Sequence, residues 1–247
     1  MRLKVFSSSS KGNAYALIDS KGNSLLLECG VPVVEIKKFL DFNLEGIQGC
    51  LLSHLHGDHS KYHKQYLDSG IHVAMGIETA TGLGIENHHR VKIIEANRKY
   101  TSMLNEFTVI PVNMVHDTPC FGFVIKHEEM GNLVFITDSY YSPFKFSNIT
   151  HWLVEANYSE GIIDSEGYGT TNSLVRNRVL ESHMSIENLV KLFRANDMSK
   201  TKNIVLTHLS DTNSNEKEFI KIIQRSTGKM VHVASPGLVL DISINPF

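Results

Sequence analysis

The stretch Ser53-His54-Leu55-His56-Gly57-Asp58-His59 decides how this sequence is interpreted. It follows the apolar run Ile47–Leu52, which predicts a buried strand. In an extended segment, side chains two positions apart point to the same side, so the first two histidines can hold one cation. The glycine lets the chain bend and turn the aspartate and the last histidine toward a second position. Nitrogen and oxygen ligands without thiolate suit Zn, Mn or Fe. The alternative to a metal site is a solvated loop in which the histidines occur by chance.

Three more candidate ligands lie far away in the sequence, and each directly follows an apolar run that predicts a strand. They are His116, Asp138 and His208. Strand ends are places where a rigid sheet presents side chains to a shared crevice. The sequence therefore predicts a two-metal site with seven ligands: His54, His56, Asp58, His59, His116, Asp138 and His208.

Composition narrows the class of protein. The chain has 247 residues, 42% hydrophobic and 20% charged, with a formal net charge of -2, which excludes a disordered, fibrous or broadly basic protein. No apolar run approaches the roughly 18–20 residues of a membrane span, and the N-terminus has no signal-peptide core. Cys29, Cys50 and Cys120 are scattered without CxxC spacing. A reducing, cytoplasmic environment is therefore expected, rather than a disulfide framework.

The hydrophobic pattern predicts two sets of strands. Near the N-terminus, Arg2–Phe6, Ala14–Ile18 and Leu25–Leu27 predict an antiparallel meander. The last third predicts helices at Ser173–Leu180, Ser185–Arg194 and Asn215–Arg225, although Ser185-x-x-Asn188 is only a weak cap. Each of the two sets of predicted strands has predicted helices beside it, which predicts an α/β fold with four layers, an αββα sandwich. The whole chain, residues 1–247, is expected to form one such domain.

These residues resemble the metallo-β-lactamase superfamily, and the match runs over nearly the whole chain. The resemblance implies two divalent metal ions, Zn or Mn, and divides the predicted ligands between them. One metal is assigned His54, His56 and His116. The other is assigned Asp58, His59 and His208, and Asp138 bridges the pair.

Further motifs are similar to the YycJ/WalJ-type exonucleases, which are related to tRNase Z. They are Phe6-Ser-Ser-Ser-Ser-Lys-Gly-Asn13, His116-Asp117, Glu155-Ala156-Asn157, Arg176-x-Arg178, His183-Met184-Ser185 and Thr207-His208-Leu209-Ser210. The resemblance implies that Glu155 and His183 assist proton transfer. Two positions depart from the pattern, since Glu28 replaces the more usual Asp and Ser182 the expected Gly.

Such a site predicts phosphodiester hydrolysis. Two divalent cations outweigh the charges of Asp58 and Asp138, so the pocket attracts phosphate and a metal-activated hydroxide can attack it. Asp58 is expected to orient or deprotonate the nucleophile. A protonated His183, held by Glu155, is expected to donate a proton to the leaving alkoxide. As alternatives, Glu155 only caps or pairs, and His183 is an exposed loop residue.

Three residues are candidates for substrate binding: Asn13, Arg176 and Arg178. The arginines can grip phosphate oxygens, or they form the solvated face of a helix. Asn13 can contact substrate, or it belongs to a simple hairpin turn. Tyr140-Tyr141 can stack on a base or pack under its loop.

The leading hypothesis is a YycJ-like DNA exonuclease that uses two metal ions. The alternatives are a phosphodiesterase for cyclic or linear nucleotides, a tRNase Z-like RNA endonuclease, a thioester or lactone hydrolase, and a metal-binding module without activity. The expected partner is nucleic acid, DNA before RNA, with no membrane; assembly into a homo-oligomer is left open.

Overall fold

In a computed structural model, which describes residues 1–101, 106–164 and 173–245, the strands form two sheets. The first sheet has the order β13-β1-β2-β3-β4-β5-β6. Its strands are β1 (Arg2–Ser9), β2 (Gly12–Ile18), β3 (Ser24–Leu27), β4 (Ile47–Leu51), β5 (Val73–Met75), β6 (Val91–Ile93) and β13 (Val239–Asp241). The pairings of β1 with β2 and of β2 with β3 are antiparallel, which confirms the predicted meander.

The second sheet has the order β12-β11-β10-β9-β8-β7. Its strands are β7 (Thr108–Met114), β8 (Cys120–His127), β9 (Gly131–Ile136), β10 (His151–Glu155), β11 (Asn203–Thr207) and β12 (Met230–Val233). The strands from β9 to β12 run parallel, so their carboxyl ends meet at one edge of the sheet. Ligands bind at such an edge in many α/β proteins.

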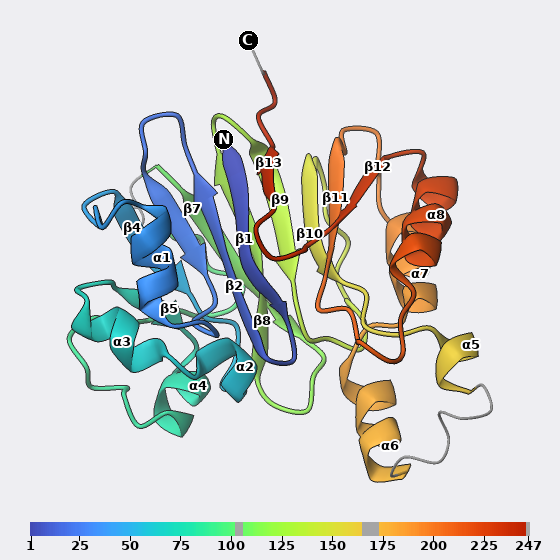
Figure 1. The fold of residues 1–247 in the computed structure, drawn as a ribbon, viewed down its shortest axis with the longest axis horizontal. Coiled ribbons are helices and arrows are strands. Elements are labelled where there is room, and N and C mark those ends of the chain that lie inside the picture. The colour runs from blue at the N-terminus through green and yellow to red at the C-terminus, as the bar shows by residue number, and fades with distance from the viewer. Residues whose placement is uncertain (102–105, 165–172, 246–247) are drawn as a thin grey trace.

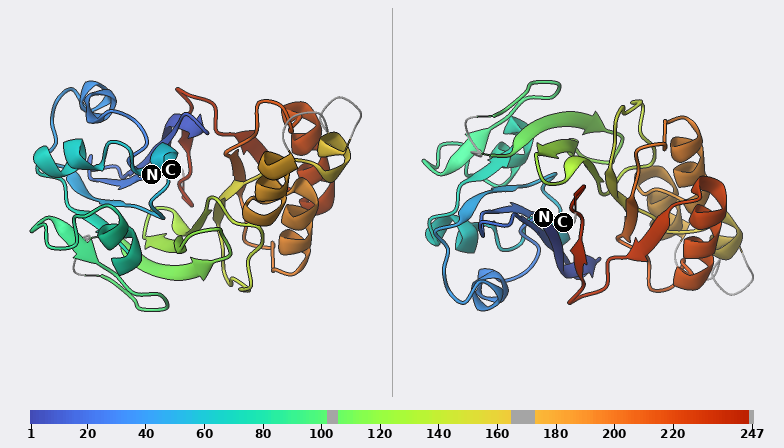
Figure 2. Two further views of the ribbon diagram at one scale, coloured as in Figure 1. Left: turned by 90° about the horizontal axis from the view of Figure 1, so that it is seen from below. Right: turned by 90° about the horizontal axis from the view of Figure 1, so that it is seen from above.

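Helices cover the outer face of each sheet (Figures 1 and 2). The first sheet carries α1 (Val33–Phe39), α2 (Gly57–Ser60), α3 (His63–Asp68) and α4 (Ile77–Gly82). The second carries α5 (Glu160–Ile163), α6 (Ser173–Ser182), α7 (Ile186–Arg194) and α8 (Glu216–Thr227). This is the predicted αββα sandwich. Among the described residues, no helix is long and apolar enough to cross a membrane.

Alternation along the strands explains the layers. Leu153 of β10 packs in the core between the two sheets, whereas its neighbours Trp152 and Val154 pack under the outer helices. Because successive side chains of a strand point to opposite faces, one continuous apolar run fills two cores.

The helix α7 begins at a cap that is stronger than its sequence indicates. Ser185 Oγ accepts the backbone N–H of Asn188 at 3.1 Å, and such a side-chain hydrogen bond satisfies a free N–H group at the helix start.

The first residue of β10 makes stability dependent on pH. His151 is buried, and burial with the nearby Lys202 ammonium lowers its pKa to about 4. The unfolded chain therefore takes up a proton near pH 6.5, before the folded protein does, and stability falls as the pH drops from about 6.5 to 4. We expect His151→Asn to reduce the loss of unfolding free energy between pH 7 and pH 5 by about 2 kcal/mol. Urea unfolding at both pH values measures this, and equal losses in both proteins would contradict it.

Candidate metal centre

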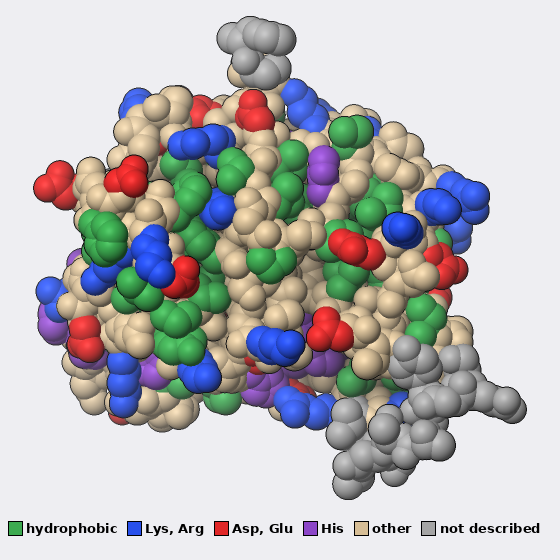
Figure 3. Space-filling model, in the orientation of Figure 1, with side chains coloured by type: hydrophobic (Ala, Val, Ile, Leu, Met, Phe, Trp, Pro, Cys, Tyr) green, Lys and Arg blue, Asp and Glu red, His purple; other side chains and the backbone are tan. Residues whose placement is uncertain are grey.

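The seven predicted ligands converge at one edge of the sandwich, in one segment after a strand of the first sheet and three segments after strands of the second. All seven lie directly after a strand or in the short helix that follows one. His54 and His56 follow β4, Asp58 and His59 lie in α2, His116 follows β7, Asp138 follows β9 and His208 follows β11. Histidine side chains gather at the corresponding lower edge in Figure 3. The packing of the two sheets thus joins loops that the sequence keeps apart.

The first group of side chains is His54, His56, His116 and Asp138, whose ligand atoms all lie within 4.8 Å of one another. His116 Nε2 is 3.1 Å from His56 Nδ1, and His54 Nε2 is 3.8 Å from Asp138 Oδ2. Tetrahedral ligands bound at zinc–nitrogen distances are separated by about 3.3 Å. The spacing of this group therefore suits a single cation.

The second group is Asp58, His59, His208 and the same Asp138. Asp58 Oδ2 is 3.1 Å from the Nε2 atoms of both His59 and His208. Asp138 Oδ1 is 3.2 Å from His59 Nε2, while its other oxygen faces the first group. One carboxylate thus has an oxygen available to each of two adjacent cations.

Hydrogen bonds on the outer side of the cluster determine which ring nitrogens carry protons. His116 Nδ1 is 2.8 Å from the carbonyl oxygen of Ser182, and His208 Nδ1 is 3.1 Å from Glu155 Oε1. These oxygens can only accept, so both imidazoles donate from Nδ1, and in the neutral ring Nε2 has a free lone pair. Such outer partners orient the histidine ligands of metal sites.

A buried, unpartnered nitrogen supports the same conclusion at His54. Among the described residues, its Nε2 has no hydrogen-bond partner, while its Nδ1 lies 2.8 Å from Ser53 Oγ. Burial and the nearby His59 lower the pKa of His54 well below its ordinary value. A neutral imidazole nitrogen that is desolvated and points into a cluster of ligands fits a metal ion.

The second group stabilises positive charge. Burial lowers the pKa of His208, but Asp138 and other carboxylates outweigh this and raise it to about 10. Burial raises the pKa of Asp58, and hydrogen bonds from His208 and His59 lower it by more, to a net value below the ordinary range. Imidazole nitrogens 3.1 Å from carboxylate oxygens need a proton or a metal ion between them. The donor set therefore fits two divalent cations, although its role as metal ligands remains a prediction.

Glu155 and His183 form a pair beside the second group. His183 Nδ1 lies 2.6 Å from Glu155 Oε1, and its ring stacks on that of His208 at 5.4 Å with an interplanar angle of 14°. The other oxygen of Glu155 accepts the backbone N–H groups of Ser139 and Met184, each at 3.0 Å. Burial lowers the pKa of His183, but Glu155 outweighs it and the net pKa is raised. This geometry favours the protonated form of His183 beside the cluster.

The backbone of His208 is in the left-handed region, with φ of 53°. This conformation is uncommon for residues other than glycine, asparagine and aspartate. Ser8 Oγ accepts the backbone N–H of His208 at 2.9 Å, and Asn157 Nδ2 donates to its carbonyl oxygen at 2.9 Å. Two side chains from distant parts of the chain thus hold this histidine in a strained position.

Asn13 lies inside the cluster, although its sequence context is also typical of a hairpin turn. It is fully buried, and its Nδ2 donates to Asp58 Oδ2 and to the carbonyl oxygen of Ser9, both at 3.1 Å. The same amide nitrogen is 3.1 Å from His59 Nε2. Asn13 therefore orients the Asp58 carboxylate.

The two predicted arginines differ in position. Arg176 forms an ion pair with Asp164. Arg178 Nε donates to Asp117 Oδ2 at 3.0 Å, and the other oxygen of Asp117 is 3.1 Å from His116 Nε2 and 3.3 Å from His56 Nε2. Arg178 thus stands at the entrance to the first group, with 60% of its side chain exposed, while Arg176 is engaged elsewhere.

Several partners of the cluster carried no clear signal in the sequence. Asp117 was part of a motif without an assigned role, and Ser182 acts through its backbone carbonyl, which no side-chain pattern reveals. Glu28 appeared only as a departure from the usual aspartate. It is buried, accepts the Ser53 N–H at 3.3 Å and lies 3.4 Å from His59 Nδ1.

Another group of potential ligands, Asp19, Glu106 and His127, lies away from this centre. His127 Nδ1 accepts the backbone N–H of Glu129 at 3.2 Å, so in the neutral ring the proton is on Nε2, the atom that faces the carboxylates. Lys21 Nζ is 2.8 Å from Glu106 Oε1 and already neutralises that charge. The arrangement is that of a buried polar pair and a surface ion pair.

Comparisons with known proteins identify the fold. The chain matches no protein-family model, and no curated protein matches it. It is similar in structure to the metallo-β-lactamase-fold protein YhfI from Bacillus subtilis, with a TM-score of 0.71, 17% identity, and coverage of 97% of this chain and 98% of that one. It is also similar to Zn²⁺-bound PqqB from Methylobacterium extorquens, with a TM-score of 0.71, 14% identity, and coverage of 98% and 100%.

Human tRNase Z, short form, is similar as well, with a TM-score of 0.65, 14% identity, and coverage of 99% of this chain and 100% of that one. At these identities, structural likeness establishes the fold alone. The chain therefore has the metallo-β-lactamase fold, and at the edge of its two sheets it carries a His/Asp cluster whose spacing is consistent with a dinuclear metal site. Its substrate and subfamily do not follow from the comparisons.

Proposed function

We propose that this protein is a dinuclear metal-dependent phosphodiester hydrolase, acting on DNA as an exonuclease. The observation that carries the proposal is the Glu155–His183 pair, in which a carboxylate holds an imidazole of raised pKa beside the second group of ligands. A leaving alkoxide needs a proton, whereas better leaving groups depart without one. The pair therefore favours phosphodiesters over thioesters, whose thiolate leaves without a proton.

Each residue of the centre has an expected task. Two bound divalent cations would acidify a water molecule and stabilise negative charge on the attacked phosphate. His54, His56, His116, Asp58, His59, His208 and the shared Asp138 would hold them. Asp58, oriented by Asn13, would position the nucleophile, and His183 would protonate the leaving oxygen. Arg178, exposed at the entrance, would exchange Asp117 for a phosphate oxygen of the substrate.

A small phosphodiester is the second candidate substrate. The net charge of -2 gives the molecule no general attraction for a polyanion, and nucleic-acid binders usually carry a stronger positive footprint. A cyclic or linear nucleotide would need only the charge of the metal centre itself. RNA cleavage like that of tRNase Z is the remaining alternative.

A substrate panel tests these proposals. Protein loaded with Zn²⁺ or Mn²⁺ is offered bis(p-nitrophenyl) phosphate, end-labelled DNA, precursor tRNA and cyclic nucleotides. We expect hydrolysis of the small diester and stepwise shortening of DNA from an end, both abolished by EDTA. Small-diester hydrolysis without polymer degradation would leave only the second candidate. Hydrolysis of thioesters or lactones without any diester cleavage would contradict the phosphodiester proposal.

A further inference from the structure

A groove lies beside the loop that follows Asp138. Its cavity has a volume of about 360 Å³, and we call it the tyrosine groove after the side chains that characterise it: Tyr140, Tyr141, Lys145, Asn188 and Lys191. The volume is within the range of sites that bind small molecules or single groups of larger ones. No motif or residue of the metal centre requires this groove.

The tyrosine groove begins next to the metal centre. Tyr140 is two residues beyond Asp138, so the two Cα atoms are at most about 7.6 Å apart. The backbone N–H of Tyr140 donates at 2.8 Å to the carbonyl oxygen of Val115, the neighbour of His116. Asn188 Nδ2 donates to the carbonyl oxygen of Tyr140 at 3.3 Å and fixes the loop to α7. A polymer held at the metals can therefore reach the groove within one or two units.

The chemistry of the tyrosine groove suits a nucleic-acid strand. Tyr140 and Tyr141 are 39% and 44% exposed, so neither is packed under its loop. Their rings meet edge to face with centroids 5.7 Å apart, a contact that uses one face of only one ring and leaves the other faces for stacking. Among the described residues, neither Lys145 nor Lys191 forms an ion pair, and no carboxylate lines the cavity; Lys191 Nζ donates to Asn188 Oδ1 at 3.0 Å. Exposed aromatic rings beside lysines whose charges no carboxylate neutralises are the two elements with which proteins bind single strands.

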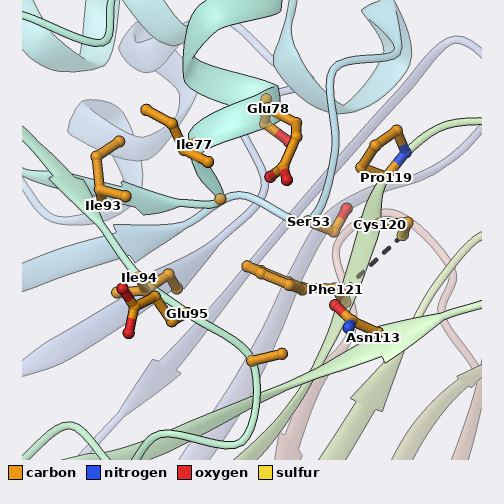
Figure 4. A pocket seen from close by; sticks show the side chains of 13 residues that line it. Ser53, Ile77, Glu78, Ile93, Ile94, Glu95, Asn113, Pro119, Cys120 and Phe121 are labelled. Atoms are coloured by element: carbon orange, nitrogen blue, oxygen red, sulfur yellow. Dashed lines mark hydrogen bonds between the residues drawn. The ribbon is translucent and has the colours of Figure 1, made fainter.

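A cavity on the other flank of the centre has the opposite character (Figure 4). It has a volume of about 480 Å³ and reaches Ser53, the outer partner of His54. Its apolar floor includes Phe121, but its lining carries the carboxylates of Glu78 and Glu95. These charges repel phosphate, so a polyanionic substrate is directed to the tyrosine groove instead.

We propose that the tyrosine groove binds the single-stranded end of a nucleic acid next to the phosphate that is cleaved. A base stacks on the exposed tyrosines, and the flanking phosphates contact Lys145 and Lys191. This inference rests on the proposed function and deepens it, because it makes the substrate a strand with bases rather than a small diester. It also supplies the local positive surface that the overall net charge lacks.

Binding without cleavage tests the inference directly. A fluorescein-labelled thymidine oligonucleotide of about six residues is titrated with the protein in EDTA and followed by anisotropy. We expect Tyr141→Ala to weaken binding about tenfold and Tyr141→Phe to stay within about twofold of the wild type, because the ring is retained. Lys145→Ala should lower the slope of log K against log salt by about 0.7. Lys64→Ala, on the exposed face of α3, is the matched control and should change neither quantity.

Two results would contradict the proposal that the tyrosine groove binds a nucleic-acid strand. One is unchanged affinity in both Tyr141→Ala and Lys145→Ala, and the other is an equal loss in Lys64→Ala, which would indicate diffuse charge attraction. Hydrolysis of bis(p-nitrophenyl) phosphate by the wild type is measured in parallel. If the diester is cleaved and the variants bind the oligonucleotide normally, the proposed binding role of the groove is wrong and the proposed hydrolase activity is retained. If the diester is not cleaved but Tyr141→Ala loses binding, the binding role is supported and the proposed hydrolase activity is contradicted.

Discussion

Asp138→Ala is expected to lower kcat/KM for bis(p-nitrophenyl) phosphate by about 10³-fold or more. Asp138 is the one residue that belongs to both groups of ligands, with one oxygen 3.2 Å from His59 Nε2 and the other 3.8 Å from His54 Nε2. Its removal leaves the imidazoles of both groups without their shared negative charge. Of the two carboxylates that would compensate the charges of two bound cations, only Asp58 would remain, so the variant would hold the second cation more weakly.

The metal content of the variant distinguishes this cause from a loss of folding. We expect the wild type to bind two equivalents of Zn²⁺ or Mn²⁺, and Asp138→Ala to bind one or fewer, as measured by mass spectrometry of the dialysed protein. Asp197→Asn removes an exposed carboxylate that only bonds within its own loop, and it should retain both metals. Full activity or full metal content in Asp138→Ala would contradict the bridging role.

His183→Ala is expected to reduce turnover of natural phosphodiesters by about 10²–10⁴-fold, the usual contribution of a positioned acid. The loss on bis(p-nitrophenyl) phosphate should be far smaller, because nitrophenolate leaves without a proton. His183 lies 2.6 Å from Glu155 and stacks on His208, so its ring is held in place for such a transfer. Comparison of kcat for the two substrates, in wild type and variant, measures the difference.

Glu155→Gln provides a second measurement on the same pair. The carboxylate of Glu155 raises the pKa of His183. A general acid acts only while it is protonated, so the rate falls above its pKa, and the amide should move this alkaline limb to lower pH. Equal losses on both substrates in His183→Ala, together with an unshifted limb in Glu155→Gln, would exclude the acid role and leave the pair a structural one.

Much of the fold was predictable because the strands repeat a simple pattern. The apolar run Ile204–Leu206 lies within β11 (Asn203–Thr207), and the run Met230–Val233 coincides with β12. The short helices α2 and α3 were not predicted, because four and six residues give little periodic pattern, whereas Glu78–Leu83 was predicted as a short helix and corresponds to α4. Asp58 and His59 are in α2, so the turn expected there is one turn of helix.

The chemistry of the site followed from residue types and spacing, but its connections did not. The pattern of histidines and aspartates at strand ends marks the seven candidate ligands in the sequence. It contains nothing about Asp117, which links Arg178 to the first group, or about the separate ion pair of Arg176 with Asp164. These contacts depend on where α6 lies relative to the loop after β7.

Local sequence patterns were sufficient to predict the layers and the kinds of candidate ligand, because hydrophobic alternation and ligand chemistry are properties of short segments. Only the tertiary structure decided which nitrogen of each histidine points inward, that Asn13 lies buried against Asp58, and that two tyrosines beyond Asp138 border a groove. These features arise between segments that are distant in the chain. Their energies come from the packing of one sheet on the other, which no local pattern contains.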